Sequence, residues 1–330
     1  MSRLAVIGGG SWGTALAAVL SPRFEQVRLW VFEADLAARI AATRENDVFL
    51  PGVSLPPNIL PTPDLPQALE GAGIVLSVMP SHHVRALAGK MAHLIAPDTP
   101  IVSATKGIEN HTLLRVSEIL AQVLGNPSRI AILSGPTFAR EVAQGKPAAV
   151  VISSANDSLA ANIQSAFRGP TLRLYTNSDT IGVELGASFK NVIAIAAGVC
   201  DGLALGSNAS AALITRGLAE ITRLAVAMGG KPLTLMGLAG LGDLLLTCTG
   251  QLSRNRTLGQ KLAAGESLAA ILGAMRMVAE GVQTTAAALD LGRKFGVDLP
   301  IITQVGDILD GRKSPVEALR ELMDRSLKGE

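Results

Sequence analysis

The sequence contains little cysteine, few aromatic residues and few charges, and each shortage excludes a class of protein. Only Cys200 and Cys248 occur among the 330 residues, which provides neither a disulfide framework nor a C-x-x-C metal motif. We therefore expect no metal site and a reducing, cytoplasmic location. Aromatic residues make up 3 %, and the 17 % of charged residues are dispersed with a net charge of +2, so we expect no nucleic acid partner.

Long uninterrupted apolar runs are also missing. Apolar runs are broken by Gly, Lys or Asp before the roughly 18 residues that a membrane span requires. The glycines from Gly8 to Gly13 also interrupt the N-terminal apolar stretch, so we expect no transmembrane segment and no signal peptide. The sequence is nevertheless 48 % hydrophobic, which is enough for a large core and a subunit interface, and its length favours two domains.

Short β-branched runs alternate with Ala- and Leu-rich helical stretches in the first half of the chain. This alternation predicts βαβ units and a doubly wound parallel sheet, with strands that are apolar throughout because helices cover both faces. After about Asn177, helical periodicity replaces the strand-like runs, which predicts an α/β domain over residues 1–178 and an all-α domain over residues 179–330. We expect the Pro-rich stretch from Asn46 to Pro66 to be an irregular connection. The expected strands are Leu4–Ile7, Val27–Val31, Ile74–Val78, Ile101–Ser103, Ile130–Leu133 and Ala149–Ile152.

Glycines at Gly8, Gly10 and Gly13 have the spacing G-x-G-x-x-G within the segment VIGGGSWGTALA. A predicted strand precedes the segment, a predicted helix follows it, and Glu33 stands 20 residues after Gly13, at the end of the second predicted strand. Glycines allow a pyrophosphate to reach backbone N–H groups at the N-terminus of the helix. We expect a dinucleotide site here; the alternative is a simple glycine turn between a strand and a helix.

Glu33 distinguishes between the two nicotinamide dinucleotides. A carboxylate at this position accepts hydrogen bonds from the ribose diol of NAD and repels the additional phosphate of NADP. No Arg or Lys stands beside it in WVFEADLAAR before Arg39. The sequence therefore favours NAD over NADP; the alternative is that Glu33 is only a surface residue or the start of the next helix.

Further segments carry candidate chemistry, and each also has a plain structural interpretation. Lys106 follows a predicted strand, at the sheet edge where ligands bind, but it is equally well explained as a solvated lysine. Thr137 and Asp243 both suit helix N-caps. The arginines of SRNR, residues 253–256, could be ordinary surface charge. Lys190 lies in a strongly apolar helical stretch, where it either snorkels to solvent or serves as an acid or base.

Together these segments resemble the NAD-dependent glycerol-3-phosphate dehydrogenases. The resemblance covers nearly the whole chain and rests on these segments, in the family's order and spacing: GGGSWGTALA, LWVFEADL, NDVFLPGVSLPPNI, TKGIE, SGPTFAREVA, ELGASFKNVIAIAAGVCDGL, AGLGDLLLTC and SRNR. It implies an N-terminal Rossmann-type domain, an all-α C-terminal domain and a homodimer. It also implies the interconversion of sn-glycerol 3-phosphate and dihydroxyacetone phosphate with NAD or NADP, which supplies the backbone of phospholipids.

The resemblance also implies roles for the candidate residues. Lys190 would exchange a proton with the C2 oxygen, Lys106 would lie near cofactor and substrate, and Asp243 would orient Lys190 or the substrate hydroxyl. The implied substrate-binding residues are Lys106, Gly135, Thr137, Lys190, Asn191, Asp243, Ser253, Arg254 and Asn255, the last three as the phosphate grip. The implied cofactor-binding residues are Gly8, Gly10, Ser11, Trp12, Gly13, Phe32, Glu33, Lys106, Ala139, Arg254, Val278 and Glu280.

The chain departs from the common bacterial pattern after the second predicted strand, where many members of the family carry a basic residue and use NADP. Here VFE stands instead, so we expect Phe32 against the adenine and Glu33 on the ribose. His83 stands where the NAD-using members have an aromatic residue. Two alternatives stay open: a 2-hydroxyacid or ketopantoate reductase of the 6-phosphogluconate-dehydrogenase-like group, and a non-catalytic NAD(H) sensor. The segments SRNR and AGLGDLLLT argue against the first, and the intact catalytic set argues against the second.

Overall fold

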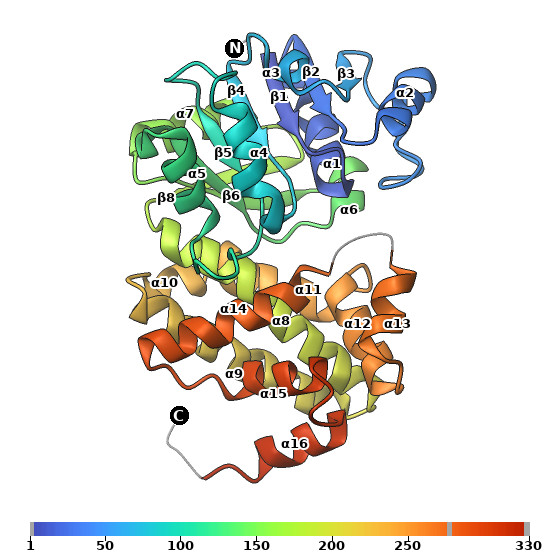
Figure 1. Ribbon diagram of the computed structural model, residues 1–330, viewed down its shortest axis with the longest axis vertical. Coiled ribbons are helices and arrows are strands. Elements are labelled where there is room, and N and C mark those ends of the chain that lie inside the picture. Colours follow the sequence, from blue (N-terminus) through green and yellow to red (C-terminus); the bar gives the residue numbers. More distant parts are fainter. Residues whose placement is uncertain (1–2, 276–278, 327–330) are drawn as a thin grey trace. The chain divides into compact units, whose positions relative to one another are not determined.

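The computed structural model describes residues 3–275 and 279–326 (Figure 1). The strands of these residues form one eight-stranded sheet in the order β3-β2-β1-β4-β5-β6-β7-β8. The strands are β1 (Arg3–Ile7), β2 (Gln26–Trp30), β3 (Ile59–Thr62), β4 (Ile74–Ser77), β5 (Ile101–Ser103), β6 (Ile130–Ser134), β7 (Ala148–Ser153) and β8 (Leu172–Asn177). All six strands expected from the sequence are present, and the predicted α/β fold class is confirmed.

The sheet is parallel from β3 to β6, but β7 runs antiparallel to β6, and β8 is parallel to β7. The expectation of a wholly parallel sheet is therefore wrong at one step. The connection between β6 and β7 contains one short helix, α6 (Ala139–Ala143), whose five residues span about 7.5 Å. Because β7 runs antiparallel to β6, the chain re-enters the sheet from the edge at which β6 ends.

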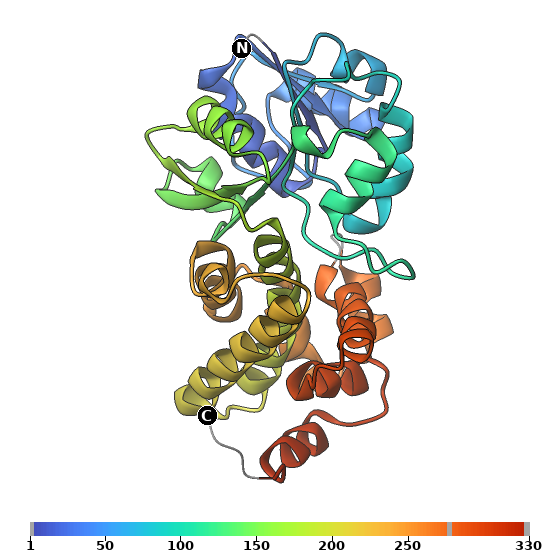
Figure 2. The same ribbon diagram turned by 90° about the vertical axis from the view of Figure 1, so that its left-hand side faces the viewer.

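Helices cover both faces of the sheet. In β1, Leu4 and Val6 face a core shared with α1, α2 and α7, whereas Ala5 and Ile7 face a second core shared with α3, α4 and α5. Figure 2 shows the light-green α7 on one side of the strands and the green α5 on the other. These helices are α1 (Ser11–Leu20), α2 (Ala34–Thr43), α3 (Leu65–Leu69), α4 (Val84–Met91), α5 (Val116–Leu124) and α7 (Asp157–Phe167).

The connection from Asn46 to Pro66 is more ordered than we expected from its prolines. It contains β3, which pairs with β2 at the edge of the sheet. Pro61 is tolerated in β3 because no further strand of the described residues pairs with this edge, so its missing N–H group is not needed. The Asn58 amide donates to the backbone carbonyls of Ser21 and Phe24, at 2.9 and 3.0 Å. These bonds fix the connection to the end of the first helical segment.

The described residues from Thr180 onward are helical and contain no strand. Their central element is α8, the long helix that carries Lys190, and its apolar window is fully buried. A helix that is apolar on all sides belongs in a core. The helices are α8 (Thr180–Gly202), α9 (Gly206–Ala227), α10 (Pro232–Leu235), α11 (Asp243–Thr249), α12 (Arg254–Ala263), α13 (Leu268–Ala274), α14 (Glu280–Phe295), α15 (Pro300–Leu309) and α16 (Pro315–Met323).

Two segments of the described chain are long and apolar enough to cross a membrane by length and composition. The first is α8, whose burial inside the protein identifies it as a core helix. The second, Pro232–Thr249, is not one continuous α-helix, because α10 ends at Leu235 and a π-helical turn, Leu238–Gly242, precedes α11. Neither segment is a clear membrane span.

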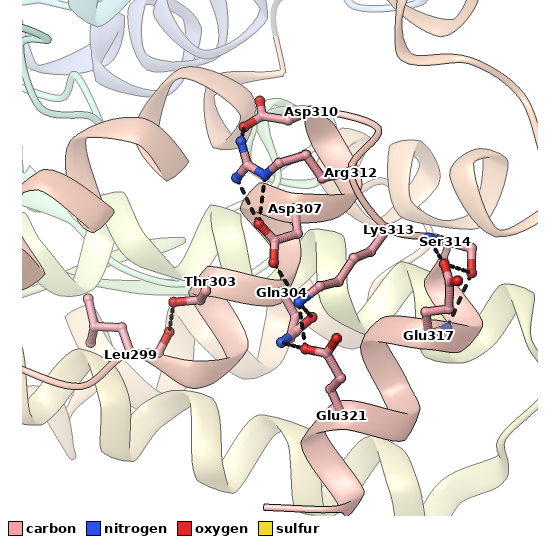
Figure 3. Close-up of polar contacts among 10 residues, drawn as sticks. All are labelled: Leu299, Thr303, Gln304, Asp307, Asp310, Arg312, Lys313, Ser314, Glu317 and Glu321. Carbon is pink, nitrogen blue, oxygen red and sulfur yellow. Dashed lines mark hydrogen bonds and ion pairs between the residues drawn. The ribbon is translucent and has the colours of Figure 1, made fainter.

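A charged cluster joins the last two helices (Figure 3). At the end of α15, Asp307 accepts hydrogen bonds from Arg312 and Lys313, and Lys313 also pairs with Glu321 of α16 at 2.5 Å. Ser314 and Glu317 form a capping box at the start of α16. These exposed pairs each contribute little stability, but together they set the direction in which α16 leaves α15.

The internal contacts divide the chain into two compact units. The sheet unit comprises Met1–Lys106 and Leu114–Val183, and the helical unit comprises Gly107–Leu113 and Glu184–Glu330. The first turn of α8 therefore packs with the sheet unit, and a short segment after Lys106 packs with the helices. The domain limits of 1–178 and 179–330 remain a prediction from the sequence.

Candidate active site

The glycine loop connects β1 to α1 at the centre of the sheet, where β2 and β4 flank β1 on opposite sides. Loops diverge at such a switch point, and ligands bind outside the carboxyl ends of the strands. A side chain at Gly8, whose φ is +129°, would overlap the Val78 carbonyl, and one at Gly13 would overlap the Gly8 carbonyl. At Gly10, by contrast, a Cβ would enter open space. Two glycines are thus required for packing, and the third leaves the backbone open to a ligand.

Asn46, which was not among the residues predicted from the sequence, holds the glycine loop by side-chain hydrogen bonds. Asn46 is buried, and its Nδ2 donates to the Gly9 carbonyl and to Thr14 Oγ1, both at 2.8 Å. Three residues on, the Phe49 carbonyl accepts a hydrogen bond from the Ser11 hydroxyl at 2.6 Å. The loop is therefore fixed by the segment that follows α2. The only signal of this support in the sequence was the segment NDVFLPG within the family resemblance.

Phe32 and Glu33 follow β2 at its carboxyl end. Phe32 is 77 % exposed, and its ring lies edge-on to Trp30 with 6.1 Å between centroids. Glu33 is exposed and precedes α2, but its carboxylate does not cap that helix. Glu33 thus stands at the N-cap position of α2 on the surface, as the plain structural alternative expects, but its carboxylate makes no capping hydrogen bond.

The segment after β6 brings further predicted residues to the same unit. Gly135 adopts φ +146°, and a Cβ there would press against the backbone of Val150. The Thr137 hydroxyl donates to the Gly135 carbonyl at 3.1 Å, so it closes the turn, and Phe138 rather than Thr137 is the N-cap of α6. Ala139, at the start of α6, packs against the core that also receives Trp12. Two of the predicted cofactor residues, Trp12 and Ala139, therefore share one core.

In the helical unit, Lys190 and Asp243 form a buried ion pair. Lys190 is 4 % exposed and Asp243 is 0 % exposed, and the Lys190 Nζ donates to Asp243 Oδ1. The same Nζ donates to the Thr247 hydroxyl at 2.9 Å, and that hydroxyl donates to the Asp243 carbonyl at 2.6 Å. Thr247 was not predicted. Its position four residues after Asp243, on the same face of a helix, is the signal that would have found it.

Local backbone geometry explains why these residues meet. Asp243 is the first residue of α11, directly after the π-helical turn, and such turns are frequent at functional sites. A Cβ at Gly186 on α8 would lie 2.8 Å from the Ala239 carbonyl in that turn. A Cβ at Gly240 would overlap the backbone of Leu235. Both glycines permit the close approach that places Asp243 over Lys190.

Glycines also allow α12 and α14 to approach α8, the helix that carries Lys190. A Cβ at Gly198 on α8 would overlap the Arg256 carbonyl, and one at Gly259 on α12 would overlap the Ile195 carbonyl. Gly281, in the first turn of α14, packs in the same way against the Asn191 carbonyl. The helices that carry residues 253–256 and Glu280 are therefore in backbone contact with α8.

The predicted phosphate grip lies at the N-terminus of α12. Ser253 is the N-cap, and its Oγ accepts from the Arg256 N–H at 3.3 Å. Asn255 Oδ1 accepts from the Gly281 N–H at 3.1 Å, so its amide is oriented, and Arg256 Nε is bound to Asp201 at 2.5 Å. Arg256 is thus a structural ion-pair residue. The Ser253 hydroxyl proton and the Asn255 NH₂ group are the donors that remain after these contacts.

Burial and neighbouring charges shift the pKa values of Arg254 and Cys248. Desolvation lowers the pKa of Arg254, and the Glu280 carboxylate opposes the decrease; the guanidinium stays protonated at neutral pH. Burial raises the pKa of the Cys248 thiol, next to Thr247, to about 12, with a smaller opposing effect of Lys190. Cys248 is therefore a neutral thiol.

Val278, a predicted cofactor residue, lies outside the described residues. Among the described residues, no three His, Cys, Asp or Glu side chains gather as metal ligands.

The other predicted residues also have defined places. Lys106 follows the last residue of β5 by three positions, at the carboxyl edge of the sheet. Asn191 is buried beside Lys190 on α8. His83 lies in the turn after β4, and its ring is 4.0 Å from that of His82. The sheet unit thus carries the glycine loop, Phe32, Glu33 and Ala139, and the helical unit carries the Lys190–Asp243 pair together with Arg254 and Glu280.

The fold and these two groups of residues define a class, that of nicotinamide-dependent dehydrogenases with a dinucleotide-binding sheet unit and a helical unit. Family models for the N-terminus and the C-terminus of NAD-dependent glycerol-3-phosphate dehydrogenase match residues 3–160 and 179–320. The chain therefore belongs to the NAD-dependent glycerol-3-phosphate dehydrogenase family, and it is an NAD(P)-dependent oxidoreductase.

Individual relatives agree with the family models. The chain is 56 % identical over 329 residues to glycerol-3-phosphate dehydrogenase (NAD(P)+) of Koribacter versatilis, and the match covers 98 % of each chain. It is 51 % identical over 330 residues to the enzyme of that name from a Geobacter species, covering 99 % of this chain and 98 % of the other. The crystal structure of a glycerol-3-phosphate dehydrogenase from Coxiella burnetii has a TM-score of 0.93 at 41 % identity, with 98 % and 99 % of the two chains covered. The ketopantoate-type reductase and the non-catalytic sensor are not favoured.

Proposed function

We propose that this protein interconverts sn-glycerol 3-phosphate and dihydroxyacetone phosphate, with Lys190 exchanging the proton at the C2 oxygen. The observation that carries the proposal is the buried contact of Lys190 Nζ with Asp243 and Thr247. A buried ion pair gives a fold little net stability, and buried charge partners in enzymes cluster where chemistry occurs. Membership of the family supplies the substrate pair.

The residues of the sheet unit fit a nicotinamide dinucleotide. We assign the pyrophosphate to the loop from Gly8 to Gly13, including Ser11 and Trp12, because Gly10 leaves the backbone open and α1 begins at Ser11. When bound, NAD⁺ supplies the redox chemistry by accepting a hydride from C2 of glycerol 3-phosphate, and NADH returns it to dihydroxyacetone phosphate. We further assign Ala139, Arg254, Val278 and Glu280 to the cofactor, as the family resemblance implies.

Lys190 performs the proton transfer that accompanies the hydride. In oxidation the C2 hydroxyl proton passes to the neutral Lys190 amine while the C2–H bond breaks and the C2=O bond forms. In reduction the Lys190 ammonium returns that proton to the carbonyl oxygen. Asp243 stabilises the ammonium form by charge, and Thr247 fixes the direction of Nζ by a hydrogen bond. The amine is thereby aimed by two partners on one helix.

The phosphate of the substrate is assigned to the start of α12. The Arg254 guanidinium is permanently charged, and the Ser253 hydroxyl and the Asn255 amide are oriented donors beside it. Lys106, Gly135, Thr137 and Asn191 are assigned to the remainder of the substrate. A dianion held at a fixed point places C2 at a fixed distance from Lys190.

Cofactor choice is assigned to Glu33. Its carboxylate is exposed at the end of β2 and caps no helix, and the exposed ring of Phe32 stands beside it. We propose that Phe32 stacks on the adenine and Glu33 accepts from the ribose diol, so that NAD is preferred over NADP.

The assembly and location follow the family resemblance. We propose a cytoplasmic homodimer that feeds glycerophospholipid synthesis. The apolar stretch Val183–Leu205 is largely buried within one chain, whereas Leu233 of α10, Met236 and Leu245 of α11 are exposed. These exposed side chains support an interface there. Sedimentation should give the mass of two chains, and a single-chain mass would contradict the dimer.

Turnover of the purified protein tests the proposed function. NADH should be oxidised when dihydroxyacetone phosphate is added, and dihydroxyacetone without its phosphate should be a far poorer substrate, because the donors of α12 would have no dianion to bind. Absence of turnover with the phosphorylated substrate, while NADH still binds, would contradict the proposal.

A further inference from the structure

A buried hydroxyl on α8 lies two residues before Lys190. Ser188 is 2 % exposed, its Oγ donates to the Glu184 carbonyl at 2.7 Å, and it accepts from the Gly107 N–H at 3.0 Å. The bond to Glu184 lies within the helix and does not explain why a serine stands at this position. A side-chain hydrogen bond to the carbonyl four residues back slightly destabilises a helix. The second bond joins α8 to a segment 81 positions away in the sequence. The serine is therefore explained by the bond to Gly107.

Gly107 is the residue directly after Lys106, where the chain leaves one compact unit for the other. On the sheet side, the Thr105 hydroxyl donates to the Met79 carbonyl at 2.9 Å, and its N–H donates to Ser103 Oγ at 3.3 Å. On the helical side, the Gly107 N–H is held by Ser188. The main chain at Lys106 is thus anchored by its neighbours on both sides.

The segment that follows is held in an unfavourable conformation. Gly107 has φ +141°, and His111 and Leu113 have φ values of +74° and +61°, which residues with side chains rarely adopt. Such strain persists only where surrounding contacts determine the backbone, and it gathers at functional sites. The segment Gly107–Leu113 packs with the helical unit.

We propose that Ser188 is a positioning residue for Lys106. The peptide unit joining Lys106 to Gly107 is planar, so fixing the Gly107 N–H on α8 fixes the base of the Lys106 side chain relative to the helix that carries Lys190. The inference rests on the proposed function, in which both lysines meet one substrate. Loss of the Ser188 hydroxyl would release this peptide unit and misplace the Lys106 amine.

Three variants test the proposal by steady-state kinetics. Ser188→Ala should raise the KM for dihydroxyacetone phosphate about fivefold to tenfold with a smaller effect on kcat, because a misplaced group near a substrate costs binding and orientation. Ser188→Thr keeps the hydroxyl and should restore the KM. Thr285→Val is the control, since the Thr285 hydroxyl is buried in α14 and donates only to the Gly281 carbonyl four residues back. It should leave the KM unchanged.

A double-mutant cycle separates positioning from a structural role. In a Lys106→Met background, Ser188→Ala should change kcat/KM by less than twofold, because its effect passes through the amine that is already missing. Equal losses in both backgrounds, or no loss from Lys106→Met itself, would overturn the inference. These outcomes leave the proposed function standing, since that fails if the wild-type protein does not turn over dihydroxyacetone phosphate or if turnover survives the loss of Lys190.

Discussion

Lys190 on α8 and Asp243 on α11 form an ion pair that is almost completely removed from water, although 53 positions separate them in the sequence. Both groups must lose their hydration when the chain folds, and their mutual attraction and the Thr247 hydrogen bond offset part of that loss. This relationship makes stability and activity respond differently to substitutions at the two positions.

Removal of one charge should harm both properties, whereas removal of both should harm activity alone. Asp243→Asn leaves a buried ammonium without its carboxylate, so the free energy of unfolding should fall by about 3 kcal/mol and kcat by about 100-fold. Lys190→Met/Asp243→Asn carries no charge at either position and should recover most of the stability without activity. Denaturant unfolding and steady-state kinetics measure the two effects. A double variant no more stable than Asp243→Asn would contradict the account.

The Thr247 hydroxyl should matter for rate, although the sequence did not indicate it. Thr247→Val keeps the shape and loses the bond to Lys190 Nζ, so kcat/KM should fall about tenfold, as for the loss of one hydrogen bond to a charged group. Thr249→Val is the matched control, because the Thr249 hydroxyl lies on the same helix and donates to the Leu245 carbonyl. Similar kinetics for the two variants would remove Thr247 from the site.

Glu33 should set the preference between the two cofactors. We expect kcat/KM with NADH to exceed that with NADPH by at least about tenfold, because a phosphate beside this carboxylate is repelled. Glu33→Ser should raise kcat/KM with NADPH and reduce the ratio. Glu25→Ser removes an exposed carboxylate before β2, at the opposite end of that strand, and should leave the ratio unchanged. A wild-type ratio near one would contradict the assignment.

The helical unit should become less stable as the pH rises, because the buried carboxyl of Glu220 ionises. This carboxyl is 2 % exposed on α9 and accepts from the Ile301 and Ile302 N–H groups, at 2.7 and 3.2 Å, where α15 begins. Burial raises its pKa from 4.5 to about 7; the two backbone bonds and Arg223 oppose the shift, and Asp298 adds to it. The folded state therefore holds this proton more tightly than the unfolded state.

The sign of the pH dependence follows from that difference. The stabilising effect is complete below about pH 4.5 and is lost between pH 4.5 and 7, a loss of about 3 kcal/mol for this group. Glu220→Gln removes the titration, so the decrease in Tm between pH 5 and 8 should become shallower. Glu317→Gln is a useful contrast, because bonds from Ser314 lower the pKa of Glu317 and its contribution is lost as the pH falls. An unchanged slope in Glu220→Gln would exclude the proposed role.

Most of the sheet could be predicted from the sequence because continuous apolar β-branched runs bounded by turns allow few other structures. β3 was missed because its proline argues against a strand, an argument that fails at a sheet edge. The direction of β7 could not be predicted, because its apolar run is compatible with either direction and the connection from β6 is long enough for both. Local pattern specifies strands but not their direction.

The candidate site was predictable where a motif carries its own chemistry, as in the glycine loop. The contacts of Asn46, Thr247 and Ser188 were not, because each is a polar residue whose partner is remote or lies one helical turn away. The ion pair of Arg256 Nε with Asp201, 55 positions away, likewise could not be predicted from the motif SRNR. Roles that depend on which partner a side chain finds require the folded structure.

The central claim is that Lys190 transfers the proton, and one pair of measurements tests it most directly. NADH oxidation with dihydroxyacetone phosphate and NADH binding by fluorescence are compared for the wild-type protein and Lys190→Met. The account predicts that the variant binds NADH with unchanged Kd, because Lys190 is not among the residues assigned to the dinucleotide, and that kcat falls at least about 100-fold. Normal turnover in Lys190→Met would contradict the account.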